Sequence, residues 1–258
     1  MAPESIIQVR DLVARYEENL ILDKISFDVQ RGEILVILGT SGCGKTTLLR
    51  HMIGLNTPSA GQVVIDGDDI TSGDETAFNR ALRKIGILFQ GSALFGSMTL
   101  SENIALPLEE YSGFPKNVIT NMVMRKLCLV NLQDYANYFP DEISGGMKKR
   151  AGLARALTLN PSILFLDEPT AGLDPIISAE IDELMLQINQ RIGTTMVIVT
   201  HELESIFKVA NRVIMLDKET KSVIAEGDPR HLREHHRNPF VKQFFSRKAK
   251  PEALEKSI

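Results

Sequence analysis

The 258-residue sequence contains no apolar run long enough to cross a membrane. Its longest unbroken apolar runs, such as residues 34–38, are far shorter than the roughly 18 residues of a membrane helix. The chain opens without the charged and then apolar segment of a secretory signal, and it has only two cysteines, Cys43 and Cys128. We therefore expect a non-exported protein of a reducing compartment, without a disulfide framework.

A strong basic excess is also missing, because the net charge is −4. This balance argues against a general nucleic-acid-binding protein. The charge is uneven, however, since residues 229–258 carry eight Lys or Arg against three Asp or Glu. With 43% hydrophobic and 24% charged residues, the chain as a whole has the composition of a globular protein with a large core.

Short apolar runs alternate with stretches of helical pattern along the chain. The alternation predicts an α/β fold with a mainly parallel sheet covered on both faces. Residues 6–30 have the pattern of an antiparallel hairpin region, and residues 91–160 form a mainly helical insert. The predicted strands are residues 34–38, 63–65, 85–89, 163–166, 196–199 and 213–216, and the predicted helices are residues 45–53, 144–158, 178–191 and 202–210.

A glycine-rich segment follows the first of these strands and opens the first helix. It fits the pattern G-x-x-x-x-G-K-[ST], in which backbone N–H groups surround a phosphate at a helix N-terminus. The lysine brings a positive charge to the β- and γ-phosphates, and the following hydroxyl can bind Mg²⁺. The predicted nucleotide-binding residues are Gly39, Thr40, Ser41, Gly42, Cys43, Gly44, Lys45, Thr46 and Thr47, with Thr46 also a magnesium ligand.

Two carboxylates end the apolar strand that lies 122 residues after Lys45. Asp167 at the strand end can hold magnesium through water, and Glu168 can polarise a water for in-line attack on the γ-phosphate. Strands that end in solvated acids are common, so the two carboxylates alone are weak evidence. Their assignment to magnesium binding and catalysis is supported by the glycine-rich motif on the same predicted sheet.

A Ser-Gly-Gly run at the start of a predicted helix forms a third candidate phosphate site. Ser144, Gly145 and Gly146 offer a hydroxyl, open N–H groups and the positive end of a helix dipole. For the tripeptide alone, an ordinary helix cap with a flexible turn is the better explanation. The combination with the two preceding motifs favours a phosphate.

Together these motifs resemble the ATP-binding cassette (ABC) family, and the resemblance covers residues 6–228. Residues 144–147 match the family signature Leu-Ser-Gly-Gly-Gln, from which Ile143 and Met147 depart. The resemblance implies a P-loop NTPase fold of the RecA type with an N-terminal antiparallel region and a helical subdomain. It further implies a D-loop ending at Asp174, a switch histidine at His201, a catalytic and magnesium-binding Gln90, and an adenine-stacking Tyr16.

The same resemblance implies an ATPase that uses ATP and Mg²⁺ and sandwiches two nucleotides in a head-to-tail homodimer. In that dimer the signature of one subunit completes the ATP site of the other. Residues 1–228 are expected to form the nucleotide-binding domain, with its helical subdomain at about 91–160. Residues 229–258 are expected to form a basic C-terminal tail, either solvated or docked as a helix through its phenylalanines.

Two segments resemble the ATPases of Mla- or MCE-type phospholipid transporters of Gram-negative bacteria. They are residues 89–108 and the run from Ser144 to Arg155. This resemblance implies an integral membrane permease, an MCE-domain protein and in some systems a STAS-domain subunit as partners. It implies a position on the cytoplasmic face of the inner membrane. Leu94 and Phe95 are expected either to receive a permease helix or to pack beneath the helical insert.

Other functions stay open at this point. The chain could be the ATPase of an ABC importer for another substrate, or a non-transport ABC ATPase of the iron–sulfur assembly type. A chromosome or DNA-repair ATPase would need a long coiled-coil insertion between Lys45 and Asp167, which the spacing excludes. A translation-factor ABC protein would carry two cassettes, whereas one set of motifs is present.

Overall fold

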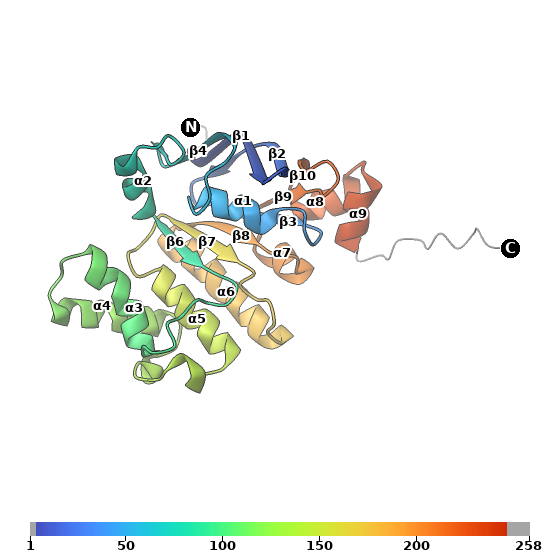
Figure 1. The fold of residues 1–258 in the computed structure, drawn as a ribbon. Coiled ribbons are helices and arrows are strands. Elements are labelled where there is room, and N and C mark those ends of the chain that lie inside the picture. Colours follow the sequence, from blue (N-terminus) through green and yellow to red (C-terminus); the bar gives the residue numbers. More distant parts are fainter. Residues whose placement is uncertain (1–3, 247–258) are drawn as a thin grey trace.

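The computed structural model describes residues 4–246, and in it two sheets and a group of helices form successive layers (Figure 1). The first sheet has the strand order β2-β1-β4-β5 and is antiparallel throughout. Its strands are β1 (Ser5–Tyr16), β2 (Asn19–Gln30), β4 (Ala60–Ile65) and β5 (Asp68–Asp69). The predicted antiparallel N-terminal region is therefore confirmed.

The prediction for residues 63–65 was wrong in one respect. It grouped them with the strands of the parallel sheet, but they end β4 and pair with β1. Val63 and Ile65 are buried while Val64 between them is partly exposed, which is the pattern of a sheet with one face fully covered. Three residues were too few to distinguish this pattern from a fully buried strand.

The second sheet has the order β10-β9-β3-β8-β7-β6. Five of its strands are parallel, as predicted, and every residue of β3, β7 and β8 is buried, which explains their continuous apolar sequences. The sixth strand, β10, was not predicted and pairs antiparallel at one edge. The strands are β3 (Ile34–Gly39), β6 (Ile85–Leu88), β7 (Ile163–Asp167), β8 (Thr195–Val199), β9 (Arg212–Leu216) and β10 (Val223–Gly227).

Alternate residues of β3 enter two different cores. Leu35 and Ile37 pack with the antiparallel sheet and with helix α1 (Lys45–Met52), which lies between the two sheets. Val36 and Leu38 pack on the opposite face with helices that come later in the chain, beyond residue 99. The two-residue period of the strand thus joins three layers around one central sheet.

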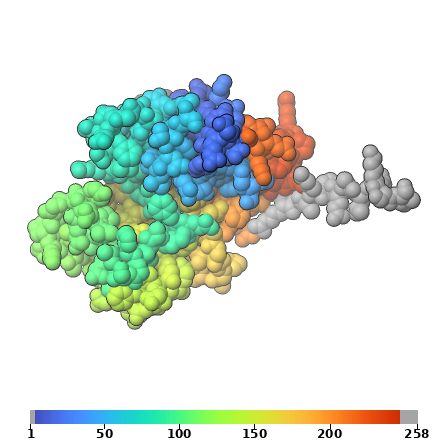
Figure 2. All heavy atoms as spheres, viewed as in Figure 1, coloured from blue at the N-terminus to red at the C-terminus, as the bar shows by residue number. Residues whose placement is uncertain are grey.

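The predicted helical insert is confirmed, since residues 91–160, all of them described, contain no strand. It holds α3 (Leu100–Tyr111), α4 (Lys116–Leu129) and α5 (Gly145–Ala156), with two short 3-10 turns between α4 and α5. In Figure 2 this part forms a green lobe below the blue and cyan N-terminal region. The other helices of the main body are α2 (Glu75–Leu82), which was not predicted, α6 (Pro175–Ile192) and α7 (Leu203–Val209).

Part of the predicted C-terminal tail is folded. Two helices, α8 (Pro229–His235) and α9 (Pro239–Ser246), continue the structure beyond residue 228. Leu232, Val241 and Phe245 are buried in the main core, and the Phe245 ring lies 5.8 Å from that of Phe207 on α7. The docked-helix interpretation is therefore correct up to residue 246, and residues 247–258 lie outside the described part. Within residues 4–246, no helix is long and apolar enough to span a membrane.

Candidate active site

The carboxyl ends of four neighbouring parallel strands bring the separate sequence motifs together. Val199 at the end of β8 is in register with Ile37 of β3 on one side and with Asp167 of β7 on the other. Gln90 follows β6, the neighbour of β7, and is exposed. His201 follows β8. In parallel sheets this edge is where ligands bind.

The glycine-rich loop leaves this edge between β3 and α1, as its sequence predicts. Gly39 and Gly44 have φ angles of 148° and 100°, and a Cβ atom on Gly39 would lie 2.4 Å from the Leu216 carbonyl oxygen. The Lys45 ammonium donates hydrogen bonds to the carbonyls of Gly39, at 3.0 Å, and Thr40, at 3.2 Å. The loop therefore curves around its own lysine.

The start of α1 suits an anion. Within the described residues, the helix has no side-chain cap and no acidic residue in its first turn, so neither a cap nor a negative charge competes with an anion there. Thr46 and Thr47 lie in this turn and are partly exposed. Cys43 is buried beneath the loop, and this burial raises the pKa of its thiol, which leaves the backbone of Cys43 as the part that can contact a ligand.

Asp167 is a buried carboxylate at the end of β7, with 6% of its surface exposed. Its Oδ1 atom has no hydrogen-bond partner among residues 4–246. Burial and then the neighbouring charge of Glu168 raise the pKa of Asp167. An unpartnered buried carboxylate is costly, and a hard cation such as Mg²⁺ is the ligand that its oxygen suits.

Glu168 is held at its backbone nitrogen and at one carboxylate oxygen. It adopts a φ of 48°, its N–H donates to the Val199 carbonyl at 2.8 Å, and its Oε1 lies 2.7 Å from Nδ1 of His201. Its second oxygen, Oε2, is buried and has no partner in the described part of the chain. The His201 side chain is 63% exposed, so the pair lies at the boundary between the core and the site. The structure thus joins Glu168 and His201, two of the three residues that were predicted to be catalytic, while the third, Gln90, makes no hydrogen bond to this pair in the described part of the chain.

The signature segment and the predicted D-loop lie side by side. Ser144 caps α5 and accepts a hydrogen bond from the Met147 N–H at 3.3 Å, while Gly145 is exposed. A Cβ atom on Gly146 would lie 2.6 Å from Cγ2 of Ile177, near the start of α6. Asp174 caps α6 by accepting from the N–H groups of residues 176 and 177, each at 3.0 Å. The two helix starts form one surface.

Tyr16, the predicted adenine platform, ends β1 with 45% of its surface exposed. Its hydroxyl accepts a hydrogen bond from Asn56, which lies four residues beyond the end of α1, at 2.9 Å. The tyrosine is therefore tied to the segment that follows the glycine-rich loop and helix. Its contact with adenine stays a prediction.

Sequence reasoning missed Lys149 and the contacts of Arg155. Lys149 is only 5% exposed, and its ammonium donates to the backbone carbonyls of Gln90 and, at 2.8 Å, Glu168. Burial lowers the pKa of Lys149, against the opposing effect of nearby carboxylates. The signal was available, because Lys149 lies three residues after buried Gly146 and four before buried Leu153 on one face of α5.

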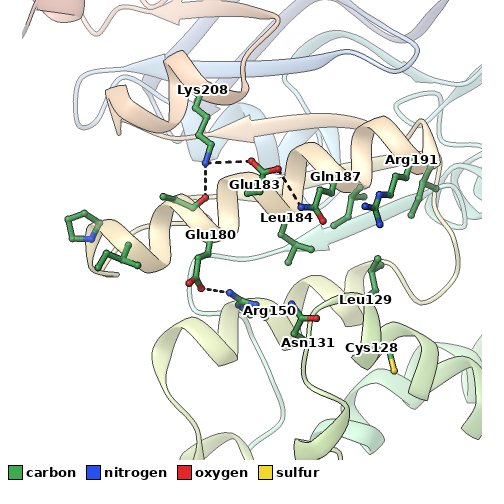
Figure 3. A pocket seen from close by; sticks show the side chains of 15 residues that line it. Cys128, Leu129, Asn131, Arg150, Glu180, Glu183, Leu184, Gln187, Arg191 and Lys208 are labelled. Carbon is green, nitrogen blue, oxygen red and sulfur yellow. Dashed lines mark hydrogen bonds and ion pairs between the residues drawn. The ribbon is translucent and has the colours of Figure 1, made fainter.

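A large groove of the described chain lies away from this site. It is a groove of about 1110 Å³ along α6, opposite α4 and α5 (Figure 3). Figure 3 shows Arg150 of α5 reaching Glu180 of α6 across it, and Lys208 reaching Glu183. None of the residues predicted to bind nucleotide is among its lining residues in the described part. The pair Arg150–Glu180 joins the helical part to the main body, whereas Lys208–Glu183 joins two helices of the main body.

A family model described as "ABC transporter" matches residues 22–171. The chain belongs to the ABC transporter family. It is 40% identical over 240 residues to a probable ribonucleotide transport ATP-binding protein mkl of Mycobacterium leprae, covering 93% of this chain and 68% of that relative. It is 42% identical over 224 residues to the methionine import ATP-binding protein MetN of Brucella abortus, covering 87% of this chain and 60% of that relative.

Solved cassettes have the same fold. The ATP-binding cassette MJ0796, a dimer in a post-hydrolysis state bound to ADP and Pi, is 30% identical with a TM-score of 0.78, covering 86% of this chain and 98% of that one. The cbiO1 protein of Clostridium perfringens, part of the transporter complex cbiONQ, is 29% identical with a TM-score of 0.80, covering 88% and 90%. This ABC cassette is therefore an ATPase subunit of a membrane transport system, and the predicted fold class is confirmed.

Proposed function

We propose that this cassette hydrolyses ATP with Glu168 as the group that polarises the attacking water. The observation that carries this proposal is that the two carboxylate oxygens of Glu168 have different environments. Oε1 is fixed by His201 at 2.7 Å, and Oε2 has no partner among the described residues. A general base needs a fixed orientation and a free lone pair, and Glu168 has both.

The remaining residues at the carboxyl edge of the parallel sheet would bind and orient the nucleotide and its metal ion. Bound ATP with Mg²⁺ supplies the electrophilic γ-phosphate. Lys45 and the open first turn of α1 would hold its phosphates, and Thr46 and Asp167 would hold the metal, with Gln90 as a further ligand. The unpartnered Oδ1 of Asp167 supports this assignment, because a buried carboxylate oxygen requires a donor or a cation.

We further propose that two copies share their sites head to tail. The surface made by Ser144, Gly145 and Asp174 presents polar groups and exposed backbone toward solvent. Such a surface is suited to the phosphates of a nucleotide that is bound to a second copy. The dimeric state of the similar cassette MJ0796 supports this arrangement.

A groove of about 530 Å³ is the proposed docking site for the permease, and we expect it to face the cytoplasmic side of the membrane. Its apolar lining comes from α2, β6, α3 and the end of α5 and includes Leu82, Pro107, Tyr111 and Leu159. Of the two residues expected to receive a permease helix, Leu94 packs on the main core, so the alternative packing role applies to it. Phe95 is 51% exposed and lies beside the groove-lining Arg155.

The cargo that we propose is phospholipid, moved by an MCE-type system with an MCE-domain protein and, in some cases, a STAS-domain subunit. The two segments that carry this resemblance meet next to the groove. Arg155, from the second segment, donates to the carbonyls of Ala93 and Ser92 in the first, at 2.8 and 3.0 Å. Their contact supports a shared role in recognising one kind of permease.

A second candidate is an importer of a small polar solute. It is favoured by the names of the relatives, one assigned to ribonucleotide transport and the other to methionine import. This chain spans 60% of the length of the methionine import relative.

Purification of the tagged chain from detergent-solubilised membranes of its own host tests both candidates. We expect a complex with a permease, an MCE-domain protein and bound phospholipid, whose ATPase activity does not respond to methionine or ribonucleotides. A complex with a solute-binding protein and solute-stimulated ATPase would overturn the lipid assignment. Tyr111→Asp in the groove should abolish permease binding, whereas Tyr135→Asp, at an exposed tyrosine outside the groove, should not.

A further inference from the structure

We infer that Lys149 is a positioning residue, which connects the signature helix to the backbone of both Gln90 and Glu168. This inference rests on the proposed role of Glu168. Lys149 lies in the second turn of α5, the helix that begins with the signature glycines. Its ammonium reaches two carbonyls that belong to two different segments, one following β6 and one following β7.

The contact fixes the peptide of Glu168 from both sides. Glu168 has a φ of 48°, a left-handed conformation that residues other than glycine and asparagine seldom adopt. The Val199 carbonyl accepts from its N–H at 2.8 Å, and Lys149 donates to its C=O at the same distance. With the backbone held in this way, the side chain points to His201 and Oε2 stays free.

Packing alone does not explain a lysine at this position. Burying an ammonium is costly, and an apolar side chain of similar length would fill the same volume without that cost. What the ammonium adds is a set of three donors, two of which are used on carbonyls of the catalytic edge. Lys149 therefore sets the position of these two segments relative to α5.

The arrangement links the two halves of a shared ATP site. An α-helix is stiff, and α5, with its 12 residues, is about 18 Å long. A small rotation of α5 when its signature end meets the second copy is passed to Gln90 and Glu168 through one side chain. The neighbouring Arg150 is instead paired with Glu180 on α6, at the molecular surface.

The test compares Lys149→Met with Lys148→Met. Methionine has nearly the length of lysine but no donor, and Lys148 is the partly exposed neighbour on the same helix. For Lys149→Met we expect kcat to fall by about 10²-fold, the effect of a displacement of roughly 1 Å at the reacting centre. ATP affinity and the melting temperature should stay near those of the parent. Lys149→Gln, which keeps one donor group, should recover part of the loss.

Hydrogen exchange of the nucleotide-free protein gives a readout that is independent of hydrolysis. In Lys149→Met the amides of residues 90–93 and 168–173 should exchange faster, and those of α1 should not change. Unchanged exchange in these segments, or a kcat equal to that of the parent, would overturn the inference. A fall in melting temperature that accounts for the loss of activity, without recovery by Lys149→Gln, would also overturn it.

A double-mutant cycle separates this inference from the proposed role of Glu168. If Lys149 acts through Glu168, Lys149→Met should have no further effect on the residual hydrolysis of Glu168→Gln. An additional full loss in that background would show that Lys149 acts elsewhere. If Glu168→Gln alone kept normal turnover, the base assignment would fail, while the exchange measurement would still report whether Lys149 holds the Glu168 backbone.

Discussion

Two glycine-containing segments of this chain each lie at the start of a helix, and they are built differently. The segment before α1 uses Gly39 and Gly44 in left-handed conformations and folds back on the Lys45 ammonium. The segment before α5 is capped by its own Ser144, and neither Gly145 nor Gly146 has a positive φ. The first encloses a concave site within one chain. The second presents an exposed surface with the Ser144 hydroxyl and the Gly145 backbone.

This difference indicates that the two segments have different roles in phosphate binding in the proposed dimer. A phosphate bound by the loop at α1 meets N–H groups, a lysine and the carboxylate edge, all from one chain. A phosphate near Ser144 would meet one hydroxyl and one helix end, which is too little for binding by itself. The α5 segment is therefore expected to act only when a second copy brings a nucleotide to it.

Of the variants considered, Glu168→Gln should lower ATP hydrolysis the most, because Glu168 belongs to the site beside the α1 loop. Hydrolysis should fall by about 10²–10⁴-fold, the contribution of a general base. ATP and magnesium binding should persist, because Lys45, Thr46 and Asp167 are unchanged, and the ATP-bound dimer should accumulate. Steady-state phosphate release and size-exclusion chromatography with ATP measure both effects. Near-normal turnover would refute the base assignment.

Mixing two inactive variants tests whether the α5 surface works across subunits. Lys45→Ala removes the charge in the loop, and Ser144→Arg blocks the signature. A heterodimer of these chains has one intact composite site and one doubly damaged site, so the mixture should regain part of the hydrolysis that each variant lacks. Absence of ATP-dependent association in the mixture, with association in the parent, would contradict the shared site.

Substituting one glycine in each of the two segments compares how tightly the surrounding atoms restrict the backbone there. Gly39→Ala brings a Cβ atom to 2.4 Å from the Leu216 carbonyl oxygen in a conformation with φ of 148°, and should destabilise the fold by about 2–3 kcal/mol. Gly145→Ala meets only Leu173 at 3.6 Å and should stay within about 0.5 kcal/mol. Chemical denaturation measures both. Equal losses would mean that the two segments are equally constrained.

Two buried carboxylates give the smallest expected effect. Burial raises the pKa of Asp167 and of Asp182, which accepts from Ser205 on α7. Above its raised pKa each charge is held in the fold at a cost, and below the ordinary value of 3.8 both folded and unfolded states are protonated and the cost is absent. Asp167→Asn and Asp182→Asn should therefore raise the melting temperature at pH 7, an advantage that disappears as pH falls below 3.8.

Magnesium distinguishes the two carboxylates. A change of 1 kcal/mol shifts the melting temperature of a domain of this size by about 2–4 °C, so calorimetry can resolve these effects. Magnesium with ATP should stabilise the Asp182→Asn protein as it does the parent, and should stabilise Asp167→Asn much less. Equal stabilisation of both variants would exclude Asp167 as the metal-binding carboxylate.

Residue patterns were sufficient to predict the five parallel strands of the central sheet, the loop at α1 and the order of the motifs. Continuous Ile, Val and Leu runs such as those of β3 and β7 can be buried only as strands covered on both faces. A parallel sheet then brings Gly39, Asp167 and His201 to one edge without further information. Local pattern and covalent order were sufficient for these features.

The tertiary structure was needed to determine which residues face the interior where several similar residues follow one another in the sequence. One of three consecutive basic residues, Lys149, became a buried ligand of two carbonyls, because the ends of β6 and β7 lie under that face of α5. Leu94 packs inside while Phe95 is exposed, and Phe245 of the predicted tail enters the core beside Phe207. Each outcome depends on a partner distant in sequence. Periodicity within one segment cannot specify such a partner, because burial is a property of two facing surfaces.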